Sequence, residues 1–184
     1  MPKASLEPFR LMLRAALGEP LDAGDREPVF WSNAPGSTAN EEAARAFCAE
    51  HPTGTILLID TPAGRAVDTL ISKYRPSQEQ ADVIWGLLSH RFASGAAGPA
   101  HAFVTGSPTS RVFRAVEARE LGEAPAHHGV WLHDGATGRW IDRADMISTF
   151  AAQEGDFFVT RDPEEQLIIM EEVERFRPVR TRAP

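Results

Sequence analysis

The chain contains very little cysteine: its one thiol, Cys48, has no second cysteine with which to form an intramolecular disulfide. The fold must therefore be stabilised by packing, which suits a reducing compartment, and we expect the protein to act in the cytoplasm. Long apolar runs are also missing, since no stretch approaches the roughly 20 apolar residues of a membrane span. No charged segment followed by an apolar one marks a secretory signal at the start of the sequence. We expect no membrane partner, although delivery to the cytosol by a larger machine would leave no trace here.

An excess of positive charge is absent too, because the formal net charge is -7 and the isoelectric point is near 5.4. Duplex-binding proteins usually present a clustered basic face, so nucleic acid is not expected as a partner. Basic residues gather only near the end of the sequence, at Arg175, Arg177, Arg180 and Arg182. We interpret residues 177 to 184 as a frayed, solvated tail.

What is present is the composition of one ordinary soluble domain. The 184 residues are 42% hydrophobic and 24% charged, and no low-complexity tract interrupts them. That length can bury a substantial core but falls short of two full-sized domains, so residues 1 to 184 are predicted to form a single domain.

The first half of the sequence favours helices. Ser5 can cap a helix that runs to Gly18, and residues 19 to 28 then form a connection. Thr38 and Glu41 have the spacing of a capping box before a short helix with Cys48 on its buried face. A buried strand is expected over residues 55 to 59, and the clearest helix begins at a second capping box, Ser77 and Gln80, and ends near residue 94.

The second half alternates between strands and helices. Strands are predicted at residues 100 to 105, 111 to 118, 129 to 134 and 156 to 160, and helices at 142 to 152 and 163 to 175. Asp162 and Pro163 match the start of the last helix. We predict an α/β (α+β) fold, in which a helical lobe of about residues 1 to 98 packs on a small, mostly parallel sheet with flanking helices within residues 99 to 176. A ligand cleft is expected between the two lobes.

Two of the four tryptophans stand where a ligand could reach them. Trp31 is predicted to lie in a loop before the turn-forming residues 32 to 36, and Trp85 is on the apolar stripe of the predicted helix after Ser77. A tryptophan on a helix stripe is more often a core residue than a ligand platform, so Trp85 taken alone favours the core.

Together with their neighbours, these residues resemble the ADP-ribosyl cyclase and NAD glycohydrolase family. Trp31-Ser32 is similar to that family's first indole and its polar neighbour, and residues 57 to 64 followed by Asp68 resemble a Thr-Leu-Glu segment with a later Gly and Asp. The most specific match is Trp85 followed by Ser89 and residues 91 to 93, which is similar to the helix of the second indole. Residues 101 to 107 resemble the strand and Gly-Ser turn before the catalytic glutamate. The resemblance covers about residues 9 to 160.

The resemblance implies a site for NAD or NADP as substrate, with no separate cofactor and no metal. Glu117 is the implied catalytic residue, since Leu121 follows four residues later and Trp131 begins the next strand, while Glu120 and Glu123 compete for the role. The substrate-binding residues implied by the resemblance are Trp31, Ser32, Leu58, Ile59, Asp68, Trp85 and Ser89, and the candidate phosphate contacts are Arg111 and Arg114. The indoles would stack the pyridinium ring, and the carboxylate would orient the ribose.

Two departures from the family pattern matter. Ile59 stands where the family usually has a glutamate that influences cyclisation against hydrolysis, and Asn33 replaces an arginine that some members use on the diphosphate. We therefore expect hydrolysis to nicotinamide and linear ADP-ribose, with cyclase activity at most minor. The shortage of cysteine resembles the compact bacterial members found as toxins and defence effectors, which implies an immunity or regulatory protein as partner.

Other arrangements are weaker. His127, His128 and His133 fit no common structural zinc spacing, Cys48 is expected to be a small core residue, and residues 106 to 108 lack the glycine spacing of a dinucleotide-binding turn. Two alternatives to the glycohydrolase stay open. One is a catalytically weak module that senses a nucleotide or ADP-ribose, and the other is a plain interaction domain, favoured only if the two indoles are buried in separate places.

Overall fold

The computed structural model describes residues 5–107, 113–124, 126–134, 137–150 and 158–177. They form an α+β fold around a five-stranded sheet with the strand order β2-β1-β3-β4-β5. The strands are β1 (Glu27–Trp31), β2 (Thr55–Leu57), β3 (Gly98–Phe103), β4 (His127–Asp134) and β5 (Thr137–Asp142). The first four run parallel, and only β5 pairs antiparallel, at the edge beside β4.

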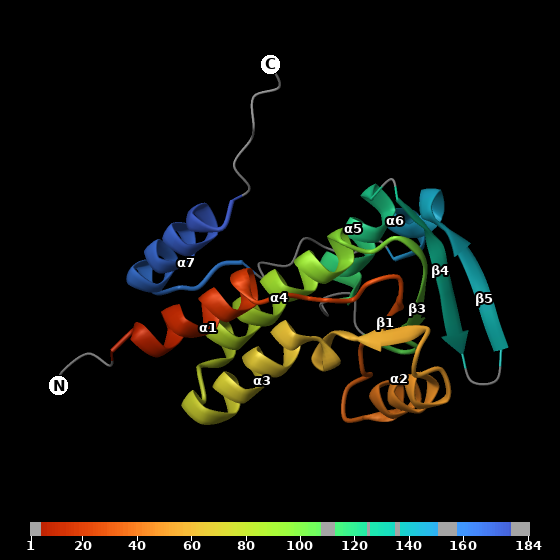
Figure 1. Cartoon of the computed structure of the whole chain (residues 1–184), viewed down its shortest axis with the longest axis horizontal. Coiled ribbons are helices and arrows are strands. Elements are labelled where there is room, and N and C mark those ends of the chain that lie inside the picture. Colours follow the sequence, from red (N-terminus) through yellow and green to blue (C-terminus); the bar gives the residue numbers. More distant parts are fainter. Residues whose placement is uncertain (1–4, 108–112, 125, 135–136, 151–157, 178–184) are drawn as a thin grey trace, which may run out of the picture.

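Helices surround this sheet on both faces and extend to one side of it (Figure 1). They are α1 (Glu7–Gly18), α2 (Ala39–Glu50), α3 (Pro62–Tyr74), α4 (Gln78–Ser94), α5 (Ala118–Glu123), α6 (Met146–Thr149) and α7 (Pro163–Arg175). Two 3-10 turns, Leu58–Asp60 and Arg143–Asp145, and one π-helical turn, Phe113–Glu117, complete the elements. Within the described ranges, no helix is long and apolar enough to cross a membrane.

Three apolar clusters hold these elements together. The first lies inside the bundle of α1, α3, α4 and α7, where Leu13, Val67 and Leu88 are fully buried. The second lies between α4, α5 and one face of the sheet, and it is centred on Phe30 and Phe113. The third lies under α2 on the opposite face of the sheet. Helix α4 contributes to the first two clusters and so joins the bundle to the sheet.

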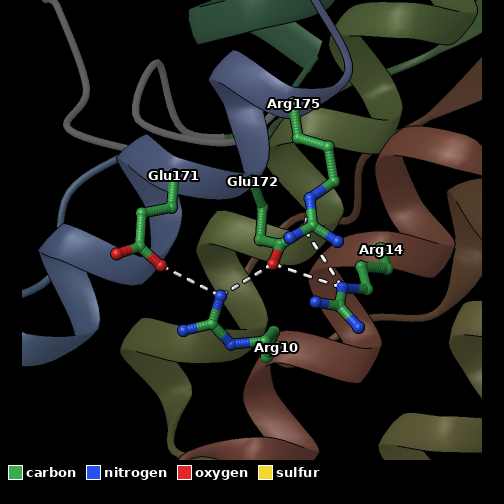
Figure 2. A network of polar contacts seen from close by, with 5 residues as sticks. All are labelled: Arg10, Arg14, Glu171, Glu172 and Arg175. Atoms are coloured by element: carbon green, nitrogen blue, oxygen red, sulfur yellow. Dashed lines mark hydrogen bonds and ion pairs between the residues drawn. The ribbon is translucent and has the colours of Figure 1, made fainter.

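The last helix is fixed to the first by a buried ion network (Figure 2). The side chain of Glu172 in α7 is fully buried and accepts hydrogen bonds from Arg10 Nη1 at 2.9 Å and from Arg14 Nε at 3.2 Å in α1. Arg175 Nε lies 3.6 Å from the same carboxylate. Burial by itself would raise the pKa of Glu172, but the hydrogen bonds from Arg14 and Arg10 outweigh it and the pKa is lowered. The carboxylate therefore stays charged and joins α7 to α1.

Several sequence predictions of local structure are confirmed. The capping box of α4 is present, since Gln80 N donates to Ser77 Oγ at 3.2 Å and Ser77 N donates to Gln80 Oε1 at 3.1 Å. Asp162 caps α7, whose bounds match the predicted residues 163 to 175. Thr38 is also an N-cap residue, but its hydroxyl donates to Glu42 Oε1 at 2.7 Å, so the capping box predicted from Thr38 and Glu41 does not form.

Other predictions of local structure are wrong. Residues 113 to 118 of the predicted strand 111 to 118 are helical, because Phe113, Val116 and Leu121 recur at helical spacing and all point into the core; residues 111 and 112 lie outside the described ranges. Residues 158 to 160 form no strand, and 156 and 157 are not described. The predicted helix 142 to 152 is split into a 3-10 turn and α6 up to Thr149.

Three elements were missed. Strand β1 begins at Glu27, within residues 19 to 28 that were predicted to be a connection. Trp31 is its last residue and so does not lie in a loop. The predicted strand 55 to 59 ends at Leu57, and a 3-10 turn follows it. Helix α3 and strand β5 were not predicted from the sequence. Residues 1 to 98, expected to be a helical lobe, therefore also supply β1 and β2 to the sheet.

Candidate functional site

The carboxyl ends of β1 and β3 form a topological switch point in the sheet. The chain leaves β1 through α2 to reach β2 on one side, whereas it leaves β3 towards β4 on the other side. Connections that leave two neighbouring parallel strands in opposite directions open a crevice between them, and open α/β sheets bind their ligands there. The topology therefore marks this edge of the sheet as the place to look for a site.

A cavity of about 680 Å³ lies at this place. That volume is within the range of small-molecule and cofactor pockets, about 300 to 1,000 Å³. Eight residues that the sequence singled out line it: Trp31, Ser32, Leu58, Ile59, Asp68, Trp85, Ser89 and Glu117. Arg111 lies outside the described residues, as does the side chain of Arg114, so the structure does not bear on these two candidate phosphate contacts.

Strand β1 carries Trp31 to the cavity because side chains alternate along a strand. Phe30 points into the core, where its ring lies 5.3 Å from that of Phe92, and Trp31 therefore points to the opposite face. The end of the strand is held by Asn40 of α2, whose Nδ2 donates to Ser32 O at 2.6 Å and to Thr105 O at 3.1 Å. This one side chain fixes the ends of β1 and β3 relative to each other.

Helix α4 provides the opposite wall. Asp82, Trp85 and Ser89 lie on one face of it, three or four residues apart, and all three line the cavity. Trp85 also packs against the helical bundle, while Trp31 packs against the cluster under α2. Both indoles are only half-buried, and both line the same cavity. A plain interaction domain was favoured only if the two indoles were buried in separate places, and they are not.

Glu117 is the buried carboxyl of the cavity. It ends the π-helical turn Phe113–Glu117, is 6% exposed, and hydrogen-bonds to the side chain of Ser89. Burial raises the pKa of Glu117 to about 8, and the hydrogen bond with Ser89 offsets only part of this effect. Phe113 and Leu121, both fully buried, anchor the helical turns before and after it. Single π-helical turns are frequent at functional sites, and a carboxyl with a strongly raised pKa in a cleft is a candidate for chemistry.

The two competing carboxylates lie elsewhere. Glu120 Oε1 is 3.1 Å from His90 Nε2, and Ser94 Oγ donates to its other oxygen at 3.2 Å. Glu123 is paired with Arg119 at 3.9 Å on the surface of α5. Neither residue lines the cavity. The geometry therefore favours Glu117 among the three.

The two departures from the family pattern have structural roles here. Ile59 lies in the 3-10 turn after β2, where it packs against the apolar cluster under α2. Asn33 Oδ1 accepts a hydrogen bond from Glu41 N at 3.1 Å and so caps the first turn of α2. Asn33 lines the cavity while its side-chain oxygen is committed to the helix.

Charged residues that the sequence did not mark as site residues also line the cavity: Glu41, Arg45 and Asp82. Glu41 and Arg45 are four residues apart on α2 and form an ion pair at 2.9 Å. The i, i+4 spacing was visible in the sequence, but such pairs are common on exposed helices and point to no site by themselves. Among the described lining residues, four carry carboxyl groups and one is an arginine, which is paired with Glu41.

The histidines do not gather into a metal site. Among the described residues, no group of three or more His, Cys, Asp or Glu side chains could hold a metal ion. His133 Nε2 lies 3.0 Å from His101 Nδ1, whose other ring nitrogen is 2.6 Å from Glu27 Oε2, whereas His127 is buried apart from them. Burial lowers the pKa of His127 to about 4 and raises the pKa of Cys48, so the imidazole and the thiol are both uncharged near neutral pH.

Comparison of the chain with protein-family models, with curated proteins and with solved structures finds no match. The assignment of the site therefore depends on its residues and its geometry alone.

Proposed function

We propose that the protein is an NAD(P)+ glycohydrolase that cleaves the bond between nicotinamide and ribose. The observation that carries this proposal is one cavity, at the switch point of the sheet, lined by a buried carboxyl group and two half-buried indoles. Trp31 and Trp85 would hold the pyridinium ring, and Glu117 would contact the ribose. Substrate recognition would also use Ser32, Leu58, Ile59 and Asp68, which line the same space.

The chemistry needs few groups, which suits this site. Nicotinamide leaves NAD as a neutral molecule from a cationic ring, so no general acid has to protonate it. Breaking the bond leaves an oxocarbenium-like ribose, and a fixed carboxylate next to this ribose stabilises the developing charge. Cation–π attraction between the pyridinium and an indole contributes roughly 0.5 to 2 kcal/mol.

The raised pKa of Glu117 fits a cationic substrate. In the free protein the carboxyl is largely protonated at neutral pH, because its pKa is about 8. A pyridinium ring close to it favours the ionised form, so binding of substrate would lower this pKa and generate the carboxylate where it is needed. Ser89, which hydrogen-bonds to the carboxyl, would hold it in position.

Water, rather than the adenine of the same substrate, is the proposed acceptor of the ribose. Ile59 supplies no polar group at the position where the family usually has a glutamate, and Trp31 and Trp85 would already be engaged with nicotinamide. Linear ADP-ribose would then be the main product, with cyclic ADP-ribose at most minor. We further propose that the protein acts in the cytoplasm as a bacterial toxin or defence effector, under control of an immunity or regulatory protein.

The test is release of nicotinamide from NAD by the purified chain, with the products separated by chromatography. Glu117→Gln keeps the shape of the side chain but removes its charge, so we expect turnover to fall by about 100-fold or more, as when one electrostatic stabiliser is removed. Glu123→Gln, on the surface of α5, is the matched control and should keep wild-type turnover. Nicotinamide release by Glu117→Gln at the wild-type rate would assign the chemistry elsewhere, and mostly cyclic product would contradict hydrolysis.

A second candidate is a module that binds ADP-ribose or a related nucleotide without turning it over. One observation favours it: the carboxyl of Glu117 is protonated in the free protein at neutral pH, as a simple hydrogen-bonding group would be. The same incubation separates the two, because a sensor module would bind ADP-ribose and release no nicotinamide.

A further inference from the structure

Arg45 belongs to two cavities at once. It lines the main cavity and also a second one of about 340 Å³, which lies beside it between α2 and the edge strand β2. The two cavities are therefore neighbours that share this arginine. Other residues around the second cavity are Arg26, Cys48, Ala49, Ile56 and Leu57.

Charge is distributed unevenly along this path. Asp68, Asp82 and Glu117, from α3, α4 and the π-helical turn, lie in the main cavity. Arg45 is the single cation among the described residues that line it. Glu41 Oε1 accepts from its Nε at 3.1 Å and from its Nη2 at 2.9 Å. A guanidinium group has five N–H donors, so donors remain for an anion, and arginine binds phosphate oxygens particularly well.

The second cavity has the chemistry of a nucleoside pocket. Cys48, Ala49 and Pro52 contribute small or apolar surface to it, and Thr55 and Asp60 contribute polar groups. Strand β2 ends the sheet, so one side of its backbone has no strand partner and can hydrogen-bond the edge of a base. Arg26 is held in a fixed orientation because its Nε donates to Ala23 O at 2.9 Å and its Nη2 donates to Asp22 O at 2.6 Å. A fixed planar guanidinium can stack on a base.

We propose that the substrate spans both cavities, with its diphosphate at Arg45 and its adenosine between α2 and β2. This inference rests on the proposed function, and it assigns each part of a dinucleotide to a different part of the protein. The cationic end lies among the carboxyl groups, the anionic centre lies at the arginine, and the adenosine lies in the smaller cavity.

The first test compares NAD with nicotinamide mononucleotide, a substrate that lacks the adenosine. Ala49→Trp fills the second cavity from an exposed position on α2, and Ala46→Trp is the matched control on the same helix, outside both cavities. We expect Ala49→Trp to raise the KM for NAD about tenfold or more, with kcat and the hydrolysis of nicotinamide mononucleotide unchanged. Ala46→Trp should leave the kinetics of both substrates unchanged.

The second test concerns the arginine at the junction. Arg45→Ala should raise the KM for both substrates, because both carry a phosphate, by about tenfold, as expected for one lost charge-assisted contact. Arg177→Ala, at the end of α7 and paired with Glu174 at 3.1 Å, is the control for loss of an exposed arginine. A KM for NAD in Arg45→Ala equal to that of Arg177→Ala would overturn the assignment of the diphosphate.

Calorimetry with ADP separates this inference from the proposed function, since ADP contains no nicotinamide. If wild type releases no nicotinamide but binds ADP, and Ala49→Trp abolishes this binding, the glycohydrolase proposal fails and the nucleotide pocket stands. The opposite outcome is that wild type releases nicotinamide, while Ala49→Trp and Ala46→Trp have the same KM for NAD and the same affinity for ADP. This outcome overturns the inference about the second cavity and leaves the glycohydrolase proposal standing.

Discussion

At the scale of single residues, Glu117 combines two properties that usually exclude each other. It is an ionisable side chain, and it is 6% exposed with one neutral hydrogen-bonding partner, Ser89. Buried carboxyl groups are normally paired with a cation, as Glu172 is with Arg10 and Arg14. The pKa of Glu172 is lowered, whereas that of Glu117 is raised to about 8. Among the described residues no cation pairs with Glu117, and of these two buried carboxyl groups it is the one that lines the cavity.

This burial makes the stability of the protein depend on pH. The folded pKa of Glu117 is about 8 and its ordinary value is 4.5, so between these values the folded state binds the extra proton. The free energy of unfolding therefore falls as pH rises from 4.5 to 8, by roughly 3 kcal/mol at pH 7.

Glu117→Gln has no carboxyl at this position, so its free energy of unfolding should not fall between pH 4.5 and pH 8 for this reason. We expect the variant to be more stable than wild type at pH 8 and about as stable as wild type at pH 4.5. Urea unfolding at the two pH values, followed by circular dichroism, measures the difference. Glu123→Gln, whose carboxyl is exposed on α5, serves as the control and should follow wild type. Equal stability of wild type and Glu117→Gln at pH 8 would contradict the raised pKa.

At the scale of elements, how well the sequence predicted the structure depends on whether the signal is local. The capping box at Ser77 and the cap at Asp162 lie within a few residues of the helices that they start, and both are confirmed. Strand β1 was missed because it is five residues long and contains Pro28, and its identity as a strand comes from pairing with β2 and β3 on both sides. Phe113 to Glu117 has β-branched and aromatic residues, yet packing against α4 makes it helical.

The candidate site followed the same rule. The family resemblance implied Trp85 and Ser89 on one helix, and Glu117 with Leu121 four residues later. The structure brings Trp85, Ser89 and Glu117 to one cavity. Arg45 was not identified, because it reaches the cavity only through the position of α2 over the ends of the strands. The roles of these residues in catalysis stay predictions.

Helix α7 illustrates how one element depends on a single buried group. Glu172→Gln would leave Arg10 and Arg14 without their shared carboxylate, and breaking a buried ion pair costs about 3 to 5 kcal/mol. We expect a loss of stability of about 3 kcal/mol in urea unfolding, with nicotinamide release unchanged under conditions where the variant is folded. Glu171→Gln is the matched control: among the described residues Glu171 is paired with Arg10 alone, its side chain is 61% exposed, and its loss should cost less than about 1 kcal/mol. Equal losses in the two variants would contradict a dominant role for Glu172.

At the scale of the whole molecule, the two halves of the chain are interleaved. Strands β1 and β2 come from the first half, and β3, which pairs with β1, opens the second half. Phe30 and Phe92 from the first half share a core with Phe113 and Val130 from the second. A separate N-terminal lobe would expose this core to water.

We therefore expect that residues 1 to 97 and 98 to 184, produced separately, neither unfold cooperatively nor release nicotinamide. Mixed during refolding, the two fragments should regain part of the activity, because the break falls after the exposed Ala97, between α4 and β3. Thermal unfolding followed by circular dichroism, together with the nicotinamide assay, gives the answer. A cooperative transition in residues 1 to 97 alone would mean that the helical part is an independent domain.

The position of α4 also determines how a ligand can enter. Its 17 residues form one continuous helix that buries Ile84 and Leu88 in the bundle and Phe92 and Ala93 in the core against the sheet. Among the described elements, α4 thus connects the wall with Trp85 directly to the core that packs against strand β1. Under the proposed function, we therefore expect substrate to associate in one step, without a slow movement of α4 against the strands before chemistry.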